Sequence, residues 1–265
     1  MEVVLVRHAE TTWNAESRWQ GQADVPLSAR GRAEAARLGA RLASVPFDVR
    51  VASDLSRTRD TAAAIGGSFE LDRAWREIDL GAWSGMLHSE VRERFPDEVR
   101  AMVTGGDRPI GGAESIPVFE ARALAALDAV IGRGRPGQRA LVVTHGGVIR
   151  AIVMRLLGLR GRPLVGATNT SITHLRVSEG RVRLVSYNCD AHLGPTFPTE
   201  AEDATCDVVS GPPHEVIERV IARLGLTPDA HQRFHPPSAR SVTRLLSGSG
   251  HPALRSYATP ALAEP

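Results

Sequence analysis

Short apolar runs alternate with amphipathic segments along the first two thirds of the chain. Runs rich in valine and alanine predict buried strands over Glu2–Val6, Val49–Ala52 and Ala140–Val143. Between these runs, apolar residues recur three and four positions apart, which predicts helices. The expected helices are Ser28–Ser44, Ser56–Ile65, Gly85–Phe95, Ser115–Ile131 and Val148–Leu157, with a glycine-rich loop over Gly105–Gly112. This alternation is typical of an α/β fold with a largely parallel sheet.

The pattern changes after the last of these helices. Ser171–Val177 and Arg181–Tyr187 predict a hairpin with Glu179-Gly180 in its turn. Residues 192–206 carry prolines and acidic residues and predict a linker. We therefore expect a main domain over residues 1–191 and a C-terminal extension over residues 207–265.

The extension resembles part of the main domain, residues 141–187. The echoed stretches are Val148-Ile149 through Leu159 with Val216-Ile217 through Leu226, and Ser171 through Tyr187 with Ser241 through Tyr257. The separation from serine to tyrosine is the same in both copies. A partial internal repeat explains this similarity, and so does chance in a chain rich in leucine, valine and arginine. About 55 residues hold too little core to stand alone, so we expect the extension to pack on the main domain or on a second subunit.

Composition narrows the class of protein. The chain has 265 residues, of which 42% are hydrophobic and 23% charged, so disorder, collagen and coiled coil are excluded as descriptions of the whole. No apolar run reaches the roughly 18–20 residues of a membrane span. Strand-forming residues begin at Glu2, so we expect no secretory segment to be removed. Two cysteines, Cys189 and Cys206, make neither a disulfide framework nor a zinc site, and we expect a cytoplasmic protein.

All of the positive side-chain charge apart from histidine is arginine, because the chain contains no lysine. Schiff-base chemistry on a lysine and a P-loop are therefore excluded. The net charge of +2 is small and scattered, which does not favour nucleic acid binding. Arginine nonetheless binds phosphate well, because its planar fork donates two parallel hydrogen bonds.

Three predicted strand ends carry cationic or potentially cationic side chains. Val3–Val6 runs into Arg7-His8, Val49–Ala52 precedes the segment that holds Arg57, and Leu141–Val143 runs into Thr144-His145. The carboxyl ends of parallel strands share one edge of a sheet, where ligands bind. One such histidine alone would be interpreted as structural. Two histidines and two arginines at one edge predict a pocket for a dianion, most naturally a phosphoryl group.

These motifs and their order resemble the histidine phosphatase superfamily, also called phosphoglycerate mutase-like. The matching segments are Arg7–Asn14, Gln20–Ser28 with Gly31, Ser53–Thr58, Glu77 within Arg76–Gly85, Gly111–Ser115, Thr144–Gly147 and Tyr187-Asn188. Ala9 stands where the family usually has glycine, and Gly111–Ser115 contains one residue more than the family element. The resemblance covers about residues 1–193 and leaves the extension outside.

The resemblance implies a three-layer α/β/α fold and a set of residue roles. His8 is expected to be the nucleophile that forms a phosphohistidine, and Glu77 the general acid and then the base. Arg7, Arg57 and His145 are expected to bind and neutralise the phosphoryl group and to lower the pKa of His8 by repulsion. Further substrate contacts are expected from Asn14, Gln20, Gly21 and Gly146. No metal or cofactor is implied, and the expected partner is a small phosphomonoester.

Two enzymatic activities fit this site. The segment from His88 to Ile110 is short and lacks an Arg-Arg pair, which favours a phosphatase over a phosphoglycerate mutase, the second alternative. A third alternative, which is not an enzyme, is a scaffold that binds phosphorylated ligands without turnover. A second anionic group would be recognised by arginines of the same segment, which are Arg92, Arg94, Arg100 and Arg108. A homodimer is compatible with the sequence.

Other candidates have simpler interpretations. We expect surface or packing roles for His88, His174, His192, His214, His231, His235 and His251. Turn or capping roles are expected for Asp24 and Asp54. Trp19 and Trp83 are candidates for the pocket wall.

Overall fold

The strands form one mixed sheet. The computed structural model describes residues 1–104, 106–159, 164–194, 206–209, 213–234, 243–246 and 253–257. Within them the sheet has nine strands in the order β3-β2-β4-β1-β5-β6-β9-β8-β7. The parallel part consists of β1 (Glu2–Arg7), β2 (Val49–Ala52), β3 (Glu70–Leu71) and β4 (Arg139–Thr144). The antiparallel part consists of β5 (Ile172–Ser178), β6 (Arg181–Cys189), β7 (Cys206–Val209), β8 (Thr243–Leu246) and β9 (Ala253–Tyr257).

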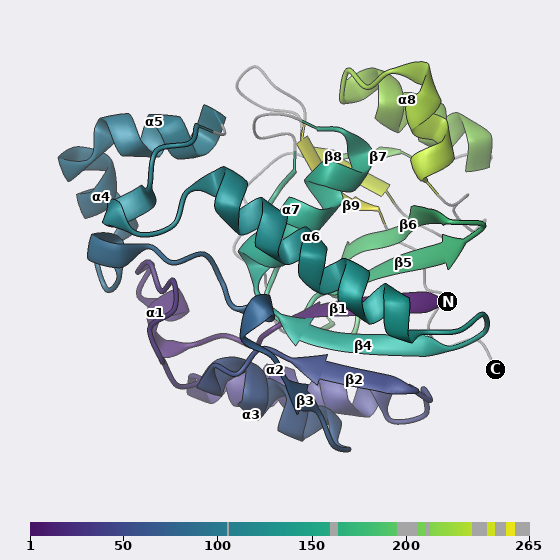
Figure 1. The fold of residues 1–265 in the computed structure, drawn as a ribbon, viewed down its shortest axis with the longest axis horizontal. Helices are drawn as coiled ribbons and strands as arrows, with labels where there is room; N and C mark the ends of the chain where they lie inside the picture. The colour runs from purple at the N-terminus through teal and green to yellow at the C-terminus, as the bar shows by residue number, and fades with distance from the viewer. Residues whose placement is uncertain are drawn as a thin grey trace.

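Helices cover both faces of the parallel strands, as Figure 1 shows. On one face, Val3 and Leu5 of β1 share a core with α6 (Ile116–Arg133) and α7 (Gly146–Leu157). On the other, Val4 and Val6 pack against α2 (Ala29–Leu42), and Ala52 packs against α3 (Ser56–Ile65). Because β1 is buried on both faces, its sequence is continuously apolar rather than alternating. The three-layer α/β/α fold is confirmed.

Two helices near the site begin at polar caps. The side chain of Ser28 accepts a hydrogen bond from the N–H of Gly31 and so starts α2. Leu55 precedes α3 and cannot cap it, and Asp24 Oδ1 instead accepts from the N–H of Ser56 at 2.7 Å. Asp24 therefore ties the loop before α2 to the start of α3, in the capping role expected of it.

The segment from residue 81 to 112 differs from expectation. A single helix was predicted over Gly85–Phe95, but the structure has a 3₁₀ turn η2 (Gly81–Trp83) and a shorter helix α4 (His88–Arg94). The helix α5 (Pro96–Thr104) was not predicted, although Pro96 at its first position and Asp97 and Glu98 in its first turn are favourable there. The other elements not foreseen are α1 (Thr12–Ala15), β3, η1 (Arg73–Trp75) and η3 (Ile110–Gly112).

The described part of the extension packs on the main domain. Its helix α8 (Pro213–Arg223) buries Val216, Ile217 and Val220 in the same core cluster as α7. The 3₁₀ helix η4 (Pro228–Arg233) is fixed by Arg233, whose Nη1 donates to the carbonyl of Leu157 at 2.9 Å. Most of the expected linker, residues 195–205, lies outside the described residues, as do His235 and His251. In the part of the chain that is described, no helix is both long and apolar enough to cross a bilayer.

Candidate active site

Strand register brings the expected residues to one edge of the sheet. Val143 of β4 pairs with Val6 of β1 on one side and with Ala52 of β2 on the other. Hydrogen bonds between the strands continue into the residues that follow them. The N–H of His8 donates to the carbonyl of Thr144 at 2.9 Å, and the N–H of Ser53 donates to the carbonyl of Val143 at 3.0 Å. His8, Ser53 and His145 therefore meet at the carboxyl ends of three neighbouring strands.

The ring of His8 is held in one tautomer. Its Nδ1 lies 2.8 Å from the carbonyl oxygen of Ala9, and because a carbonyl only accepts, Nδ1 carries the proton. The ring nitrogen with a lone pair is then Nε2. Burial lowers the pKa of His8 well below its ordinary value, and the charges of Arg57 and Arg7 lower it further. From the sequence we expected repulsion by neighbouring positive charges to lower this pKa, whereas burial of the ring is the larger cause.

His145 stands edge to face against His8, with ring centroids 5.2 Å apart. Arg57 Nε donates to its Nδ1 at 3.3 Å, so the proton of the neutral ring lies on Nε2, which donates to Ser53 Oγ at 2.9 Å. Burial lowers the pKa of His145 well below its ordinary value, with Arg57 as the next cause. The sequence left its charge open, and this arrangement makes it neutral.

Arg57 is almost completely buried, with 1% of its surface exposed. Its Nη1 donates to the carbonyl of Ala23 and its Nη2 to that of Gly21, both at 2.7 Å. Burial lowers the pKa of Arg57 to about 10, opposed by the charge of Glu77, so the guanidinium stays charged at neutral pH. Gly21 accepts this bond with a φ of 52°, a conformation that favours glycine.

Arg7 and Asn14 complete the cationic and donor groups. Arg7 Nη1 donates to the carbonyl of Ala167 at 2.6 Å. A Cβ at Gly146, the first residue of α7, would come within 3.3 Å of Arg7 Nε, so glycine leaves room for the guanidinium. Asn14 Oδ1 accepts from both the N–H and the hydroxyl of Thr11. The side-chain N–H group of Asn14 is therefore the end of the amide that can meet a ligand.

The carboxyl group of Glu77 lies against the N-terminus of α7. Its Oε2 accepts from the N–H of Gly147 at 2.9 Å, and its Oε1 accepts from the N–H of Ile78 at 3.0 Å. A Cβ on residue 147 would collide with Oε1. Glycine at this position thus allows the carboxylate to rest against the helix N-terminus.

The loop that carries Glu77 is clamped by Arg122 of α6. Arg122 donates to the carbonyl oxygens of Ala74 and Arg76 at 3.0 and 2.7 Å, and to that of Glu77 at 3.2 Å. The guanidinium is itself held by Glu114, with Nη2 2.8 Å from Oε2. One arginine therefore satisfies three carbonyls of one loop.

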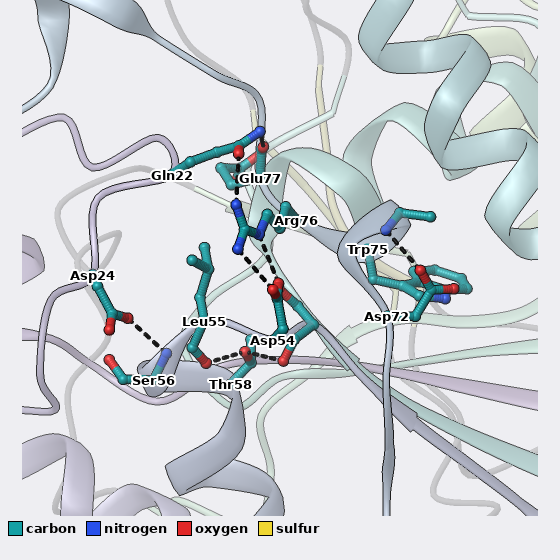
Figure 2. A network of polar contacts seen from close by, with 12 residues as sticks. Gln22, Asp24, Asp54, Leu55, Ser56, Thr58, Asp72, Trp75, Arg76 and Glu77 are labelled. Atoms are coloured by element: carbon teal, nitrogen blue, oxygen red, sulfur yellow. Dashed lines mark hydrogen bonds and ion pairs between the residues drawn. The ribbon is translucent and has the colours of Figure 1, made fainter.

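A second arginine, Arg76, belongs to this loop and anchors it through its side chain, as Figure 2 shows. Arg76 forms a bidentate pair with Asp54, in which both N–O distances are 2.6 Å. Gln22 accepts from Arg76 and donates to the carbonyl of Glu77 at 3.2 Å. Asp54 therefore anchors the Glu77 loop to the end of β2.

These residues surround a cavity of about 550 Å³. Of the residues expected from the sequence, it is lined by Arg7, His8, Asn14, Gln20, Gly21, Arg57, Glu77 and Gly146. His145 is fully buried behind His8 and Arg57 and is not part of the wall. Eight of the nine expected site residues thus line one cavity, and the ninth, His145, supports it from behind.

Comparison with known proteins identifies the family. The model of the histidine phosphatase superfamily (branch 1) matches residues 3–190. This chain belongs to that superfamily. The match ends before the extension.

Its relatives among the histidine phosphatases carry several names. Phosphoglycerate mutase-like protein 4 of Arabidopsis thaliana is 38% identical over 188 residues, which are 68% of this chain and 80% of that protein. Phosphoserine phosphatase 1 of Hydrogenobacter thermophilus is 35% identical over 211 residues, 77% of this chain and 99% of that protein. A solved mycobacterial glucosyl-3-phosphoglycerate phosphatase in complex with VO3 is 31% identical, with a TM-score of 0.65 over 71% of this chain and 98% of its own.

The histidine phosphatase cavity also has walls that sequence reasoning missed. His88, expected on the surface or in packing, lines the cavity with its ring 4.6 Å from that of Trp19. Arg18 and Arg150 also line it, whereas the four arginines expected to bind a second anion do not. Those four lie on or beside α4 and α5, where Arg100 pairs with Asp97 and Arg108 with Glu98. Trp19 lines the cavity and Trp83 is buried outside it.

Ser53 and Arg122 are further residues that this histidine phosphatase site uses and the sequence did not single out. Ser53 lay within a quoted motif, and its place at a strand end was the available signal. Arg122 lay in a predicted helix, and nothing local indicated its contact with the Glu77 loop. Among the described side chains, no group of three or more His, Cys, Asp or Glu is arranged to hold a metal ion.

Proposed function

We propose that this chain is a metal-independent phosphatase that hydrolyses small phosphorylated metabolites through a phosphohistidine on His8. The observation that carries the proposal is the fixed His8 tautomer: Nδ1–H donates to Ala9, and a depressed pKa keeps the lone pair on Nε2. An imidazole buried between two guanidinium groups is suited to attack a dianion and unsuited to hold a proton.

In the first step, His8 Nε2 attacks phosphorus in line with the ester bond. A P–N bond forms, the P–O bond breaks, and Glu77, which begins the cycle as the protonated acid, gives its proton to the departing oxygen. Arg7, Arg57 and the positive N-terminal end of α7, where Gly146 lines the cavity, neutralise charge on the equatorial oxygens. The amide N–H of Asn14 adds a further donor at the cavity wall.

In the second step, Glu77 takes a proton from water, and the oxygen attacks phosphorus. The P–N bond breaks, phosphate is released, and His8 regains its lone pair on Nε2. His145 has both ring nitrogens engaged by Arg57 and Ser53, so we assign it a positioning role. It accepts a hydrogen bond from Arg57 Nε and so helps to fix that guanidinium.

Water rather than a second hydroxyl is proposed as the acceptor. Helices α4 and α5 occupy the short segment between Glu77 and Gly111, and none of the arginines on them lines the cavity. Two of the relatives are named phosphatases. Phosphoglycerate mutase is the second candidate, because one relative is named phosphoglycerate mutase-like and because Arg18 and Arg150 on the wall are suited to a second anionic group.

The substrate class follows from the remaining walls. Trp19, Met102, Ile116, Phe119 and Leu164 give the cavity apolar surface beside its cationic end. A volume of about 550 Å³ suits a phosphomonoester with a small organic body. Phosphoserine and glucosyl-3-phosphoglycerate, the substrates in the names of two relatives, are the first to test.

The central test replaces the nucleophile. His8→Ala should lower phosphate release from every phosphomonoester by more than about a thousandfold, because it removes the group that bonds to phosphorus. A screen over phosphosugars, phosphoglycerates, nucleotides and phosphoamino acids measures it, with acid-labile labelling of the unaltered protein as a second readout.

The matched control is His214→Ala on α8, an exposed position away from the cavity. Retained turnover in His8→Ala would contradict the mechanism. Isomerisation of 3-phosphoglycerate faster than phosphate release would select the mutase. Binding of phosphate esters without turnover in the unaltered chain would select the scaffold.

A further inference from the structure

The extension repeats the pairing of the main hairpin residue by residue. In β5 and β6, His174 pairs with Ser186 and Leu175 with Leu184. In β8 and β9, Arg244 pairs with Ser256 and Leu245 with Leu254. Each residue of the second hairpin lies 70 positions beyond its counterpart, as Tyr257 does beyond Tyr187. Chance similarity of sequence would not also reproduce the pairing.

The two hairpins share the same irregularity. The register of β5 and β6 shifts between the His174 and Leu175 pairs, and that of β8 and β9 shifts between the Arg244 and Leu245 pairs. A β-bulge is a specific local feature that related strands keep. Its recurrence at equivalent positions indicates that the second hairpin is a copy of the first.

The elements before each hairpin also correspond. β4 leads into α7 and then into the hairpin of β5 and β6, and β7 leads into α8 and then into that of β8 and β9. β1, which separates β4 from β5, has no counterpart, and β7 pairs directly with β8. The extension is therefore a half copy of the sheet without the strand that leads to His8.

The copy meets the original along one strand edge. β9 pairs antiparallel with β6, and the paired residues are Tyr257 and Tyr187, which are equivalent in the two copies. When equivalent residues of antiparallel neighbours face one another, the strands are related by a twofold axis perpendicular to the sheet. Such an axis keeps helices on the same face, and α7 and α8 do share one core cluster.

We propose that the extension occupies, within one chain, the place of a second copy of the main domain at the β6 edge. A twofold contact is isologous, so a surface that fits a copy of itself fits the same surface of another molecule. An unpaired edge strand invites such pairing, and β6 is nine residues long. With β9 in place, the chain is a monomer. With β9 displaced, β6 pairs with β6 of a second chain, Tyr187 against Tyr187.

The experiment displaces β9 in the full chain. Ser256→Pro removes a backbone N–H from β9 and disfavours its place between β6 and β8. Sedimentation equilibrium should give 28.5 kDa for the unaltered chain and twice that mass for the variant. Hydrogen exchange should show the outward β6 amides protected in both proteins, and in the variant only at concentrations where it dimerises. Ala261→Pro, beyond β9 in the sequence, is the matched control and should remain monomeric.

Three results would overturn the proposal. One is a folded variant that stays monomeric with β6 amides as protected as before, because β9 would not be their cover. Another is a folded monomer that exposes those amides at every concentration, because the edge would not accept a copy. The third concerns the unaltered chain, so it applies even where Ser256→Pro does not fold. The unaltered chain would have to be a dimer itself, or a monomer whose β6 amides exchange freely.

Discussion

A single backbone N–H of α7 positions the carboxyl group of Glu77, whose protonated form we propose as the proton donor. Gly147 donates to Glu77 Oε2, and any Cβ at this position would occupy the space of Oε1. Gly147 lies in a helix without a positive φ, so alanine fits its backbone. The requirement for glycine comes entirely from the approach of the acid.

Gly147→Ala should therefore lower kcat while leaving the fold stable. We expect a loss of about a hundredfold, near the lower end of what general acid–base catalysis contributes, because the carboxylate is displaced and His8 is not. Steady-state kinetics with urea unfolding checks it. Gly132→Ala on α6 is the control, since a Cβ there meets nothing within 4 Å. Equal kcat in the two variants would contradict the assigned role of Gly147.

The sequence anticipated the residues of the site better than their states. His8 and His145 were placed by the apolar runs that precede them, because burial of a strand is visible in the local pattern. Their tautomers depend on Ala9, Ser53 and Arg57, which the fold assembles. The sequence likewise could not show that burial is the main cause of the lowered pKa of His8, because burial is a property of the whole cavity.

At the scale of elements, α6 holds the Glu77 loop in place. Arg122 reaches three carbonyls of that loop, and Glu114 fixes the guanidinium. A neutral amide cannot donate to all three oxygens at once. The loop would then be free to carry Glu77 away from Gly147.

Arg122→Gln should affect substrates according to their leaving groups. We expect kcat to fall about tenfold or more for phosphoserine, whose alkoxide needs a proton, and less for p-nitrophenyl phosphate, whose phenolate does not. Parallel assays measure the ratio. Arg133→Gln on the same helix, which loses only an exposed pair with Glu70, is the control. An equal loss on both substrates would show a general structural effect instead of a positioned acid.

Among elements, those with complete local patterns were predicted and those shaped by contacts were not. Ser28 and the apolar face after it marked α2, and the three valine-rich strands were equally clear. α5 was missed because its nine residues give only a short apolar stripe, Val99 and Met102, and bury no residue completely. β3 has two residues, both exposed, and exists only through its pairing with β2.

At the scale of the whole molecule, buried neutral histidines make stability depend on pH. Burial is the first cause that lowers the pKa of His8, His145 and His192, the last to about 4 from 6.5. For His192, Arg41 and Arg37 add to the effect. Below pH 6.5 these histidines bind protons in the unfolded chain but not in the folded chain. The free energy of unfolding therefore falls as pH falls.

His192→Gln should flatten that dependence between pH 6.5 and 4, where the unfolded His192 is protonated and the folded one is not. Urea unfolding at pH 7.5, 6 and 5 measures it, and the variant should lose less free energy than the unaltered chain on acidification. The exposed His214→Gln is the matched control. A variant that loses as much as the unaltered chain contradicts a partly buried, neutral His192.

The layers of the main fold were predictable because each of them buries its own continuous apolar pattern. The role of the extension was not, since pairing of β9 with β6 joins residues 70 positions apart that have no local relation. The sequence suggested a repeat but left chance as an equal explanation. Only the shared register and bulge separate the two.

The fixed orientation of the His8 ring has a stereochemical consequence. With Nδ1 tied to Ala9, Nε2 meets phosphorus from one side throughout the proposed reaction. The alcohol therefore departs from the opposite side, and water later arrives where the alcohol left. Each displacement inverts the phosphorus centre, so a chiral thiophosphoryl group would be handed from ester to water with its configuration retained.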